Sequence, residues 1–344
     1  MKDTSILLIY TGGTIGMRQD PTDGALRPVD FGQIAEEVPE LRKSALRIDA
    51  WSFDPLIDSS DVEPALWQSL ATLIRDRYDQ YDGFVVLHGT DTMSYSASAL
   101  SFMLENLAKP VVFTGSQLPV GAPRTDGREN LVSAIEVAAA KDAGGHALVP
   151  EVSVLFDAKL MRGNRSTKVN AEQFDAFSSP NHPLLAEAGI QIRYNLQHIR
   201  RPARWDEPLR IAGALDTRVS ILKIHPGITP QVVRNILLGP ETRAVILETY
   251  GSGNAPSKDW FLKIVDEAVA MGKLLVNVTQ CLRGAVNMQL YATGKALERS
   301  GVVSGGDCTT EGMLAKLFWL LGKYSDIREA APHIGENIRG EISE

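Results

Sequence analysis

The stretch SILLIYTGGTIGMRQD, residues 5–20, joins a short apolar run to a cluster of threonines and glycines. Residues 6–10 are typical of a buried strand, and the run ends at Thr11, Gly12, Gly13 and Thr14. Glycines after a strand often cradle a phosphate, whereas a threonine hydroxyl beside backbone N–H groups can attack a carbonyl. The stretch therefore poses a choice between a nucleotide site and a catalytic one.

Similar runs recur along the first half of the chain. Further strands are expected at 83–87, 111–113 and 152–156, each followed by small or polar residues. Helices are expected at 64–78, 94–107 and 126–140. Continuous apolar strands that alternate with helices predict a parallel sheet covered on both faces.

A second alternating series follows a stretch rich in arginine, proline and glutamine near residues 194–205. Its strands are expected at 219–224, 244–247 and 274–278, and its helices at 231–238, 258–271 and 311–321. The chain of 344 residues is also longer than a single core usually serves. We therefore predict an α/β fold of two doubly wound domains with mainly parallel sheets: a larger N-terminal domain 1–193, a linker 194–215 and a smaller C-terminal domain 216–344.

Composition limits the partners. Proteins that bind nucleic acids usually carry a basic face, so the net charge of −7 argues against a nucleic-acid partner. No apolar run approaches the ~20 residues that cross a bilayer, and the N-terminus does not resemble a signal peptide. We therefore expect a cytoplasmic protein without a membrane or nucleic-acid partner. In that compartment Cys281 and Cys308 are expected to be reduced thiols.

The sequence lacks the residues and the helix that phosphate-binding glycine loops usually have. A P-loop needs a lysine shortly after the glycines, and none follows Gly16 closely enough. A dinucleotide site needs a helix that begins directly after them, so that its N-terminus faces the pyrophosphate. Here the chain continues as RQDPTDG, a loop composition. Nucleotide binding is therefore disfavoured.

The nucleophile interpretation needs a base near a threonine. Ligands of open parallel sheets bind beyond the carboxyl ends of the strands, so residues 11–14 and 89–92 are expected to share one cleft. Thr90 and Asp91 lie there, and Lys168 is a candidate base because a desolvated lysine can lose its proton near neutral pH. Each residue alone also fits a turn, a cap or a solvated lysine. Their joint placement favours catalysis.

Seven motifs extend this hypothesis to a family. Between about residues 6 and 339 the chain carries YTGGTIG, DSSD, HGTDTM, TGSQLP, RGNRSTK, YGSGNAP and VNVTQCLRGAVNM, in this order. With these motifs it resembles the bacterial cytoplasmic (type I) L-asparaginases. The resemblance implies hydrolysis of L-asparagine to L-aspartate and ammonia without cofactor or metal, by a homodimer or a homotetramer built as a dimer of dimers.

The resemblance also implies residue roles. Thr14 would be the nucleophile that forms a β-aspartyl ester, and Lys168, with Asp91, would deprotonate Thr90. Which threonine attacks first stays open. The substrate-binding residues would be Asp58, Ser59, Ser60, Thr90, Asp91, Ser116 and Asn254, the last of them in a neighbouring subunit's site.

Two positions allow other interpretations. Ser60-Asp61-Val62-Glu63 before Pro64 is the sequence of a capping box, which would begin a helix and still present N–H groups to an anion. Many asparaginases carry a tyrosine in the loop after the first motif, about where this chain has Ala25. Tyr291 is a candidate replacement, although it also fits a tyrosine at the edge of the core.

Some type I enzymes are activated by asparagine at a second pocket between subunits. Thr167 and Cys281 match residues of that pocket, but Glu248 stands where those enzymes have an arginine. An arginine binds a carboxylate through two charge-assisted hydrogen bonds, whereas a glutamate repels it. We therefore expect no activation by asparagine through this pocket.

Two other functions compete with hydrolysis of free asparagine. One is a small-molecule binding or sensing module on the same fold, which would not need a lysine placed as a base. The other is the ammonia-producing part of a tRNA-dependent amidotransferase. That variant should carry an additional N-terminal domain, whereas the TGGT of the first motif begins here already at Thr11.

Overall fold

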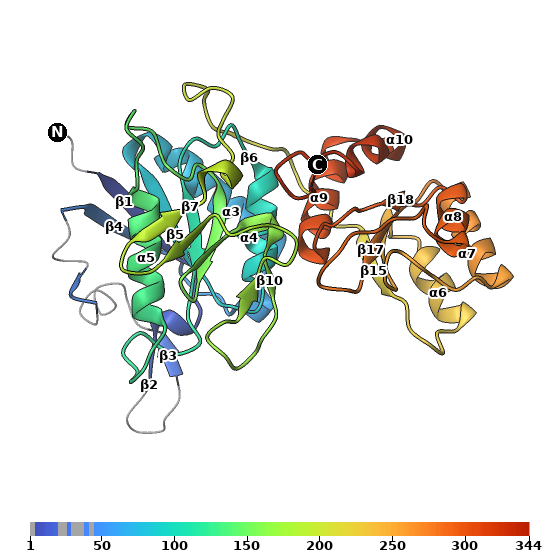
Figure 1. Ribbon diagram of the computed structural model, residues 1–344, viewed down its shortest axis with the longest axis horizontal. Coiled ribbons are helices and arrows are strands. Elements are labelled where there is room, and N and C mark those ends of the chain that lie inside the picture. Colours follow the sequence, from blue (N-terminus) through green and yellow to red (C-terminus); the bar gives the residue numbers. More distant parts are fainter. Residues whose placement is uncertain (1–3, 20–25, 29–37, 41–44, 344) are drawn as a thin grey trace. The chain divides into compact units, whose positions relative to one another are not determined.

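The computed structural model describes residues 4–19, 26–28, 38–40 and 45–343 (Figure 1). The described chain divides into two compact units. The first comprises the described residues up to Ser179 together with Pro183–Ile211, and the second comprises Pro180–His182 and the described residues from Ala212 onward. Most of the segment expected as a linker, 194–211, thus lies with the first unit.

The first unit is built on a mixed sheet that, among the described residues, has eight strands. Five of them run parallel, in the spatial order β4 (Arg47–Ser52), β1 (Ser5–Tyr10), β5 (Gly83–Leu87), β7 (Val111–Thr114) and β8 (Val152–Phe156). The sheet continues antiparallel through β9 (Lys159–Arg162), β12 (Ala186–Ala188) and β13 (Ile192–Tyr194). Consecutive residues of β1, such as Ile6 and Leu7, point to opposite faces of the sheet and are both buried, so both faces are covered, as predicted.

Among the described residues, three helices accompany this sheet: α3 (Pro64–Arg77), α4 (Met93–Met103) and α5 (Gly127–Ala139). Leu131 and Ile135 of α5 share a core cluster with Ile6 and Val85 of the sheet. The expected helix 94–107 is too long: α4 ends at Met103, because the next residues form the strand β6 (Leu104–Glu105) with the distant strand β14 (Arg210–Ile211).

Shorter elements complete the first unit. They are the strands β2 (Met17–Gln19), β3 (Leu26–Pro28), β10 (Thr167–Lys168) and β11 (Phe177–Ser178), and the 3₁₀ turns η1 (Thr14–Gly16), η2 (Ser59–Asp61), η3 (Tyr78–Gln80), η4 (Gly163–Arg165) and η5 (Leu196–His198).

The second unit has a smaller sheet that is parallel throughout its described strands. Their order is β15 (Val219–Lys223), β16 (Ala244–Thr249), β17 (Leu274–Thr279) and β18 (Val303–Ser304). Its helical segments are α6 (Pro230–Leu237), α7 (Asp259–Ala270), α8 (Ala292–Arg299), α9 (Thr310–Lys323), α10 (Ile327–Ala330) and the turn η6 (Ala331–Ile334). The predicted class, two α/β units with mainly parallel sheets, is confirmed. In neither unit is a described helix both long and apolar enough to span a membrane.

A buried ion pair fastens the C-terminal segment of the second unit to α9. Lys316 Nζ lies 2.6 Å from Glu341 Oε1, and both side chains are 0% exposed. The ammonium also donates to the carbonyl of Ile334 at 2.8 Å, and the carboxylate accepts from the backbone N–H groups of Ile338 and Arg339 at 3.1 and 2.6 Å. Each charge therefore has both its counter-ion and further hydrogen-bond partners.

Candidate active site

The ends of β1 and β5 are joined directly. Thr11 donates to the carbonyl oxygen of Leu87 twice, from its backbone nitrogen at 3.0 Å and from its hydroxyl at 2.9 Å. The strands are neighbours in the parallel sheet, so their carboxyl ends lie at one edge. Residues 11–14 and 89–92, which follow these two strands, therefore lie at the same edge of the sheet, and their expected sharing of one cleft stays a prediction.

Two glycines allow this close approach. Gly13 has φ 96°, and a Cβ on it would lie 2.5 Å from the backbone nitrogen of Gly89. Gly12 has φ 134°, and a Cβ there would lie 2.1 Å from the carbonyl oxygen of Ile57. Both positions thus require glycine. They bring Thr14, half-buried at the start of η1, to the loop that carries Thr90.

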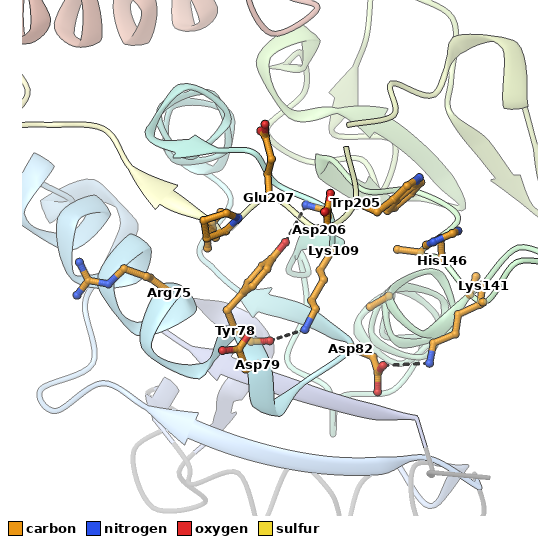
Figure 2. A pocket seen from close by; sticks show the side chains of 17 residues that line it. Arg75, Tyr78, Asp79, Asp82, Lys109, Lys141, His146, Trp205, Asp206 and Glu207 are labelled. Atoms are coloured by element: carbon orange, nitrogen blue, oxygen red, sulfur yellow. Dashed lines mark hydrogen bonds and ion pairs between the residues drawn. The ribbon is translucent and has the colours of Figure 1, made fainter. Parts of the chain in front are cut away.

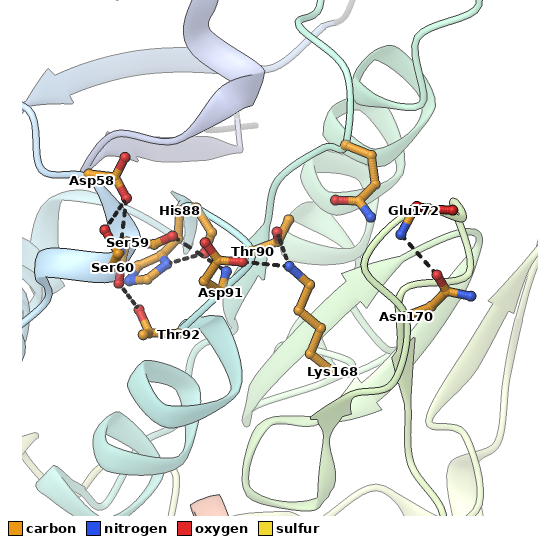
Figure 3. A network of polar contacts seen from close by, with 12 residues as sticks. Asp58, Ser59, Ser60, His88, Thr90, Asp91, Thr92, Lys168, Asn170 and Glu172 are labelled. Atoms are coloured by element: carbon orange, nitrogen blue, oxygen red, sulfur yellow. Dashed lines mark hydrogen bonds and ion pairs between the residues drawn. The ribbon is translucent and has the colours of Figure 1, made fainter.

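Lys168 connects the second threonine to an aspartate (Figure 3). Its Nζ lies 2.7 Å from Thr90 Oγ1 and 2.7 Å from Asp91 Oδ1. The lysine side chain is 20% exposed, whereas that of Asp91 is 62% exposed. This contact allows the amine, once neutral, to take a proton from the threonine hydroxyl while the carboxylate holds it in place.

A hairpin positions Lys168. The residue lies on β10, which pairs antiparallel with β11. Gln117 Nε2 donates to the carbonyl of Gln173 at 3.1 Å and so ties the hairpin loop to the loop after β7. Asn170 accepts from the N–H groups of Glu172 and Gln173 at 2.9 and 3.0 Å, which shapes that loop. Gln117 lies within the TGSQLP motif but was not among the expected site residues.

Asp58, Ser59 and Ser60 form the next part of the same edge. Asp58 Oδ1 accepts from the backbone N–H and the hydroxyl of Ser60, at 2.9 and 2.8 Å, and these hydrogen bonds hold the pKa of Asp58 below its usual range. Ser59 is buried, and its carbonyl accepts from the hydroxyl of Thr92 at 2.7 Å. The segment that carries the Asp58 carboxylate is thus bonded, through Ser59, to the loop after β5.

The predicted capping box at Ser60 is wrong. Ser60 lies in the 3₁₀ turn η2, which is capped by Asp58, and its hydroxyl donates to that aspartate. The N-cap of α3 is Glu63, which makes no side-chain capping bond. Pro64 does begin the helix, as its fixed φ favours.

Ser116 and Asn254 lie in different units. Ser116 follows β7, is buried and donates to the carbonyl of Leu118 at 2.5 Å. Asn254 belongs to the second unit, where it pairs with Tyr250 and accepts from the hydroxyl of Thr293 at 2.7 Å. Its expected place in a neighbouring subunit's site stays a prediction.

The comparisons with known proteins cover the whole fold. Residues 5–200 match the family model of the N-terminal asparaginase domain, and residues 218–332 match that of the glutaminase/asparaginase C-terminal domain. The chain belongs to the asparaginase family. Both halves of the site edge described above, around Thr14 and around Thr90, fall within the first of these domains.

Individual relatives match nearly the whole of this chain. The chain is 45% identical to L-asparaginase 1 of Escherichia coli, over 100% of this chain and 99% of that protein. It is 40% identical to the 60 kDa lysophospholipase of Mus musculus, over 98% of this chain and 62% of that protein. A crystal structure of L-asparaginase I from Vibrio cholerae superposes with a TM-score of 0.89 at 41% identity, covering 99% of this chain and 100% of that one.

Two expected departures from the family have different outcomes. Ala25 lies outside the described residues. Tyr291 is the N-cap residue of α8 in the second unit and is 53% exposed, and its role as a replacement tyrosine stays a prediction.

The expected regulatory position is already engaged within the second unit. Glu248 Oε1 accepts from the hydroxyl of Thr310, in the first turn of α9, at 2.7 Å. Arg243 is the arginine directly before β16, at the opposite end of that strand from Glu248. Its guanidinium pairs with the carboxylate of Asp216 at 2.7 Å. Cys281 is exposed. Glu248 thus places a carboxylate where the resemblance expects the binding of another carboxylate, and Thr167, on β10, belongs to the first unit.

A pocket of about 600 Å³ lies at the opposite edge of the first sheet (Figure 2). Asp82, which directly precedes β5, and Lys109, which precedes β7, line it together with Trp205. Asp82 pairs with Lys141 at 3.0 Å, and Lys109 donates to the carbonyl of Tyr81 at 2.7 Å. None of the expected catalytic residues lines this pocket. In the described part of the chain, no cluster of three or more His, Cys, Asp and Glu is placed to hold a metal ion.

Proposed function

We propose that this protein hydrolyses the side-chain amide of L-asparagine to L-aspartate and ammonia through a β-aspartyl ester on a threonine. The observation that carries the proposal is the contact of Lys168 with both Thr90 and Asp91, beside the glycine loop that presents Thr14. A threonine hydroxyl in contact with an amine is the arrangement that activates a weak nucleophile.

Thr14 is the proposed nucleophile. Its hydroxyl makes no hydrogen bond to the part of the chain that the structure describes, whereas Thr90 is engaged by Lys168. Thr14 Oγ1 forms a bond to the amide carbon, the bond from that carbon to the amide nitrogen breaks, and the hydroxyl proton of Thr14 is transferred to the nitrogen, which leaves as ammonia. Water, activated through Thr90 and Lys168, then cleaves the ester and restores the Thr14 hydroxyl.

The neighbouring residues would hold the amino-acid end of the substrate. Asp58 stays ionised over a wide pH range because of its bonds from Ser60, and with Asp91 it offers negative charge to an α-ammonium. The hydroxyl and the backbone N–H of Ser59 would receive the α-carboxylate beside Ser60, whose own N–H donates to Asp58, and Ser116 would lie near the amide. These assignments follow the family resemblance and the shared edge of the sheet.

The assembly and location follow the same resemblance. We infer a homodimer or homotetramer in which Asn254 reaches a neighbouring subunit's site, and a cytoplasmic location. Size-exclusion chromatography with light scattering measures the assembly directly. Loss of activity in Asn254→Ala, restored by mixing with a variant defective in Thr14, would support a site shared between subunits.

The test of the function separates an enzyme from a binding or sensing module. Ammonia release is measured from asparagine and from glutamine, for the wild type and for Lys168→Met. We expect turnover by the wild type and its loss in the variant, with aspartate binding retained in calorimetry. Lys141→Met, which removes an ion-paired lysine at the opposite edge of the sheet, is the matched control. Aspartate binding without any turnover by the wild type would favour the sensing module instead.

A further inference from the structure

His88 is a buried imidazole directly before the loop of Gly89 and Thr90, and no proposed step uses it. Its Nδ1 lies 2.7 Å from the carbonyl oxygen of Gly89. Its Nε2 lies 2.9 Å from Ser96 Oγ, and that oxygen lies 2.8 Å from Trp67 Nε1. Its ring packs against that of Phe113 in an edge-to-face arrangement, with the ring centroids 5.8 Å apart. The residue is thus held on every polar atom.

The chain of hydrogen bonds has one consistent direction. A carbonyl oxygen only accepts, so the contact with Gly89 requires a proton on His88 Nδ1. In a neutral imidazole Nε2 is then the acceptor, and Ser96 must donate its hydroxyl proton to it. The indole of Trp67 only donates, and it donates to the lone pair that Ser96 has left. All three bonds therefore specify one tautomer of a neutral histidine.

The environment keeps that histidine neutral. Its side chain is fully buried, and burial lowers the pKa of His88 to about 4. At neutral pH the tautomer described above is therefore the form that acts on Gly89.

The held carbonyl fixes the orientation of the peptide group that joins Gly89 to Thr90. In a planar trans peptide the C=O of Gly89 and the N–H of Thr90 point in opposite directions. Gly89 is also packed closely against its neighbours, because a Cβ on it would lie 2.5 Å from Ser59 Oγ and 3.5 Å from the Cα of Gly13. Rotation of this peptide group would move Thr90 away from the 2.7 Å contact with Lys168.

We propose that His88 is a positioning residue for the reaction. Its Nδ1–H, fixed by Ser96 and Trp67, holds the Gly89 carbonyl and so keeps Thr90 aligned with Lys168. The inference rests on the proposed function, because this alignment affects a rate only if the contact between Thr90 and Lys168 takes part in turnover.

Two variants of similar size separate alignment from packing. In His88→Asn the amide nitrogen can occupy the place of Nδ1 and donate to Gly89, whereas His88→Leu has no donor. Misplacement of a reacting group by ~1 Å can reduce a rate by about a hundredfold. We expect kcat to fall by about tenfold to a hundredfold in the leucine variant, to recover to within about fivefold of wild type in the asparagine variant, and KM to stay within about threefold in both.

Several outcomes would overturn the inference. Equal kcat values for the two variants, or a loss that lies entirely in KM, would show that the donor to Gly89 does not align the site. Absence of asparagine hydrolysis by the wild type would instead refute the proposed function, so the two failures are distinguishable. Aspartate binding and thermal unfolding confirm that each variant is folded.

Ser96→Ala tests the same idea with the imidazole in place. ¹⁵N NMR of the labelled imidazole is expected to show the Nδ1–H form in the wild type and a mixture of tautomers in this variant, with kcat reduced several-fold. Ser101→Ala is the control, since Ser101 lies on the same helix and donates only to its own turn at Ala97. An unchanged tautomer and unchanged kcat in Ser96→Ala would contradict the proposal, even if the leucine variant failed to fold.

Discussion

Lowering the pH from 7 to 4 is expected to weaken the fold through the imidazole of His88. In the unfolded chain this residue titrates near its ordinary pKa of about 6.5. In the fold burial lowers the pKa to about 4, so the native state stays unprotonated in the interval between. The unfolded state binds more protons there, and the free energy of unfolding therefore falls as the pH falls through that interval.

The size of the effect follows from the two pKa values. Each pKa unit corresponds to about 1.4 kcal/mol, so the interval from 6.5 to about 4 is worth about 3 kcal/mol at pH 4. Above pH 6.5 the imidazole is neutral in both states and no free energy of unfolding is lost. Below pH 4 it is protonated in both states and the loss does not increase further. This loss is a large fraction of the ~5–15 kcal/mol that is the ordinary free energy of unfolding of a domain.

The assay compares urea unfolding of the wild type and His88→Asn at pH 7, 6, 5 and 4. The other titrating groups are common to both proteins, so the difference between their unfolding free energies isolates His88. We expect that difference to change by about 3 kcal/mol in favour of the variant between pH 7 and 4. An NMR titration of the wild-type imidazole should show it unprotonated at pH 5. A difference that does not vary with pH, or an imidazole that titrates near 6.5, would refute the argument.

Three predictions concern catalysis and regulation. Thr14→Ala should lose asparagine hydrolysis by several powers of ten without unfolding, and more than a tenth of normal activity in ammonia release would contradict its role. Glutamine should be hydrolysed at least about a hundredfold less efficiently than asparagine, because one more methylene displaces the amide from Thr14; similar kcat/KM values would refute this. Initial rates against asparagine should be hyperbolic, because Glu248 repels a second carboxylate; a Hill coefficient clearly above one, lowered by substitution of Thr167 or Cys281, would show that the pocket still binds.

The buried strands and most helices could be predicted because their apolar pattern is local. The strand expected at 83–87 coincides with β5, and the helix expected at 64–78 differs from α3 by one residue. The strand β4 was missed because it is largely exposed and reads as polar sequence. The end of α4 was misplaced because Leu104 and Glu105 pair with a strand about a hundred residues further along, which no local pattern contains.

The site shows the same division. That Thr90, Asp91 and Lys168 would meet was predicted from their positions after strands and from the family motifs, and their contacts agree. Their catalytic roles stay predictions. The arrangement of Ser60 was predicted wrongly, because a capping box and an aspartate-capped 3₁₀ turn use the same residue types. The importance of His88 could not be read from its motif, since it depends on a serine and a tryptophan from two different helices.

The buried pair of Lys316 and Glu341 has a consequence for synthesis of the chain. A polypeptide that stops before Glu341 keeps the ammonium of Lys316 in the interior without its counter-ion. Breaking a buried pair in this way costs about 3–5 kcal/mol, a large part of the stability of an ordinary domain. A ribosome product released before that residue would thus carry a poorly folded second unit and be open to proteolysis. The stability of the second unit therefore differs between chains that include the Glu341 carboxylate and chains that end before it.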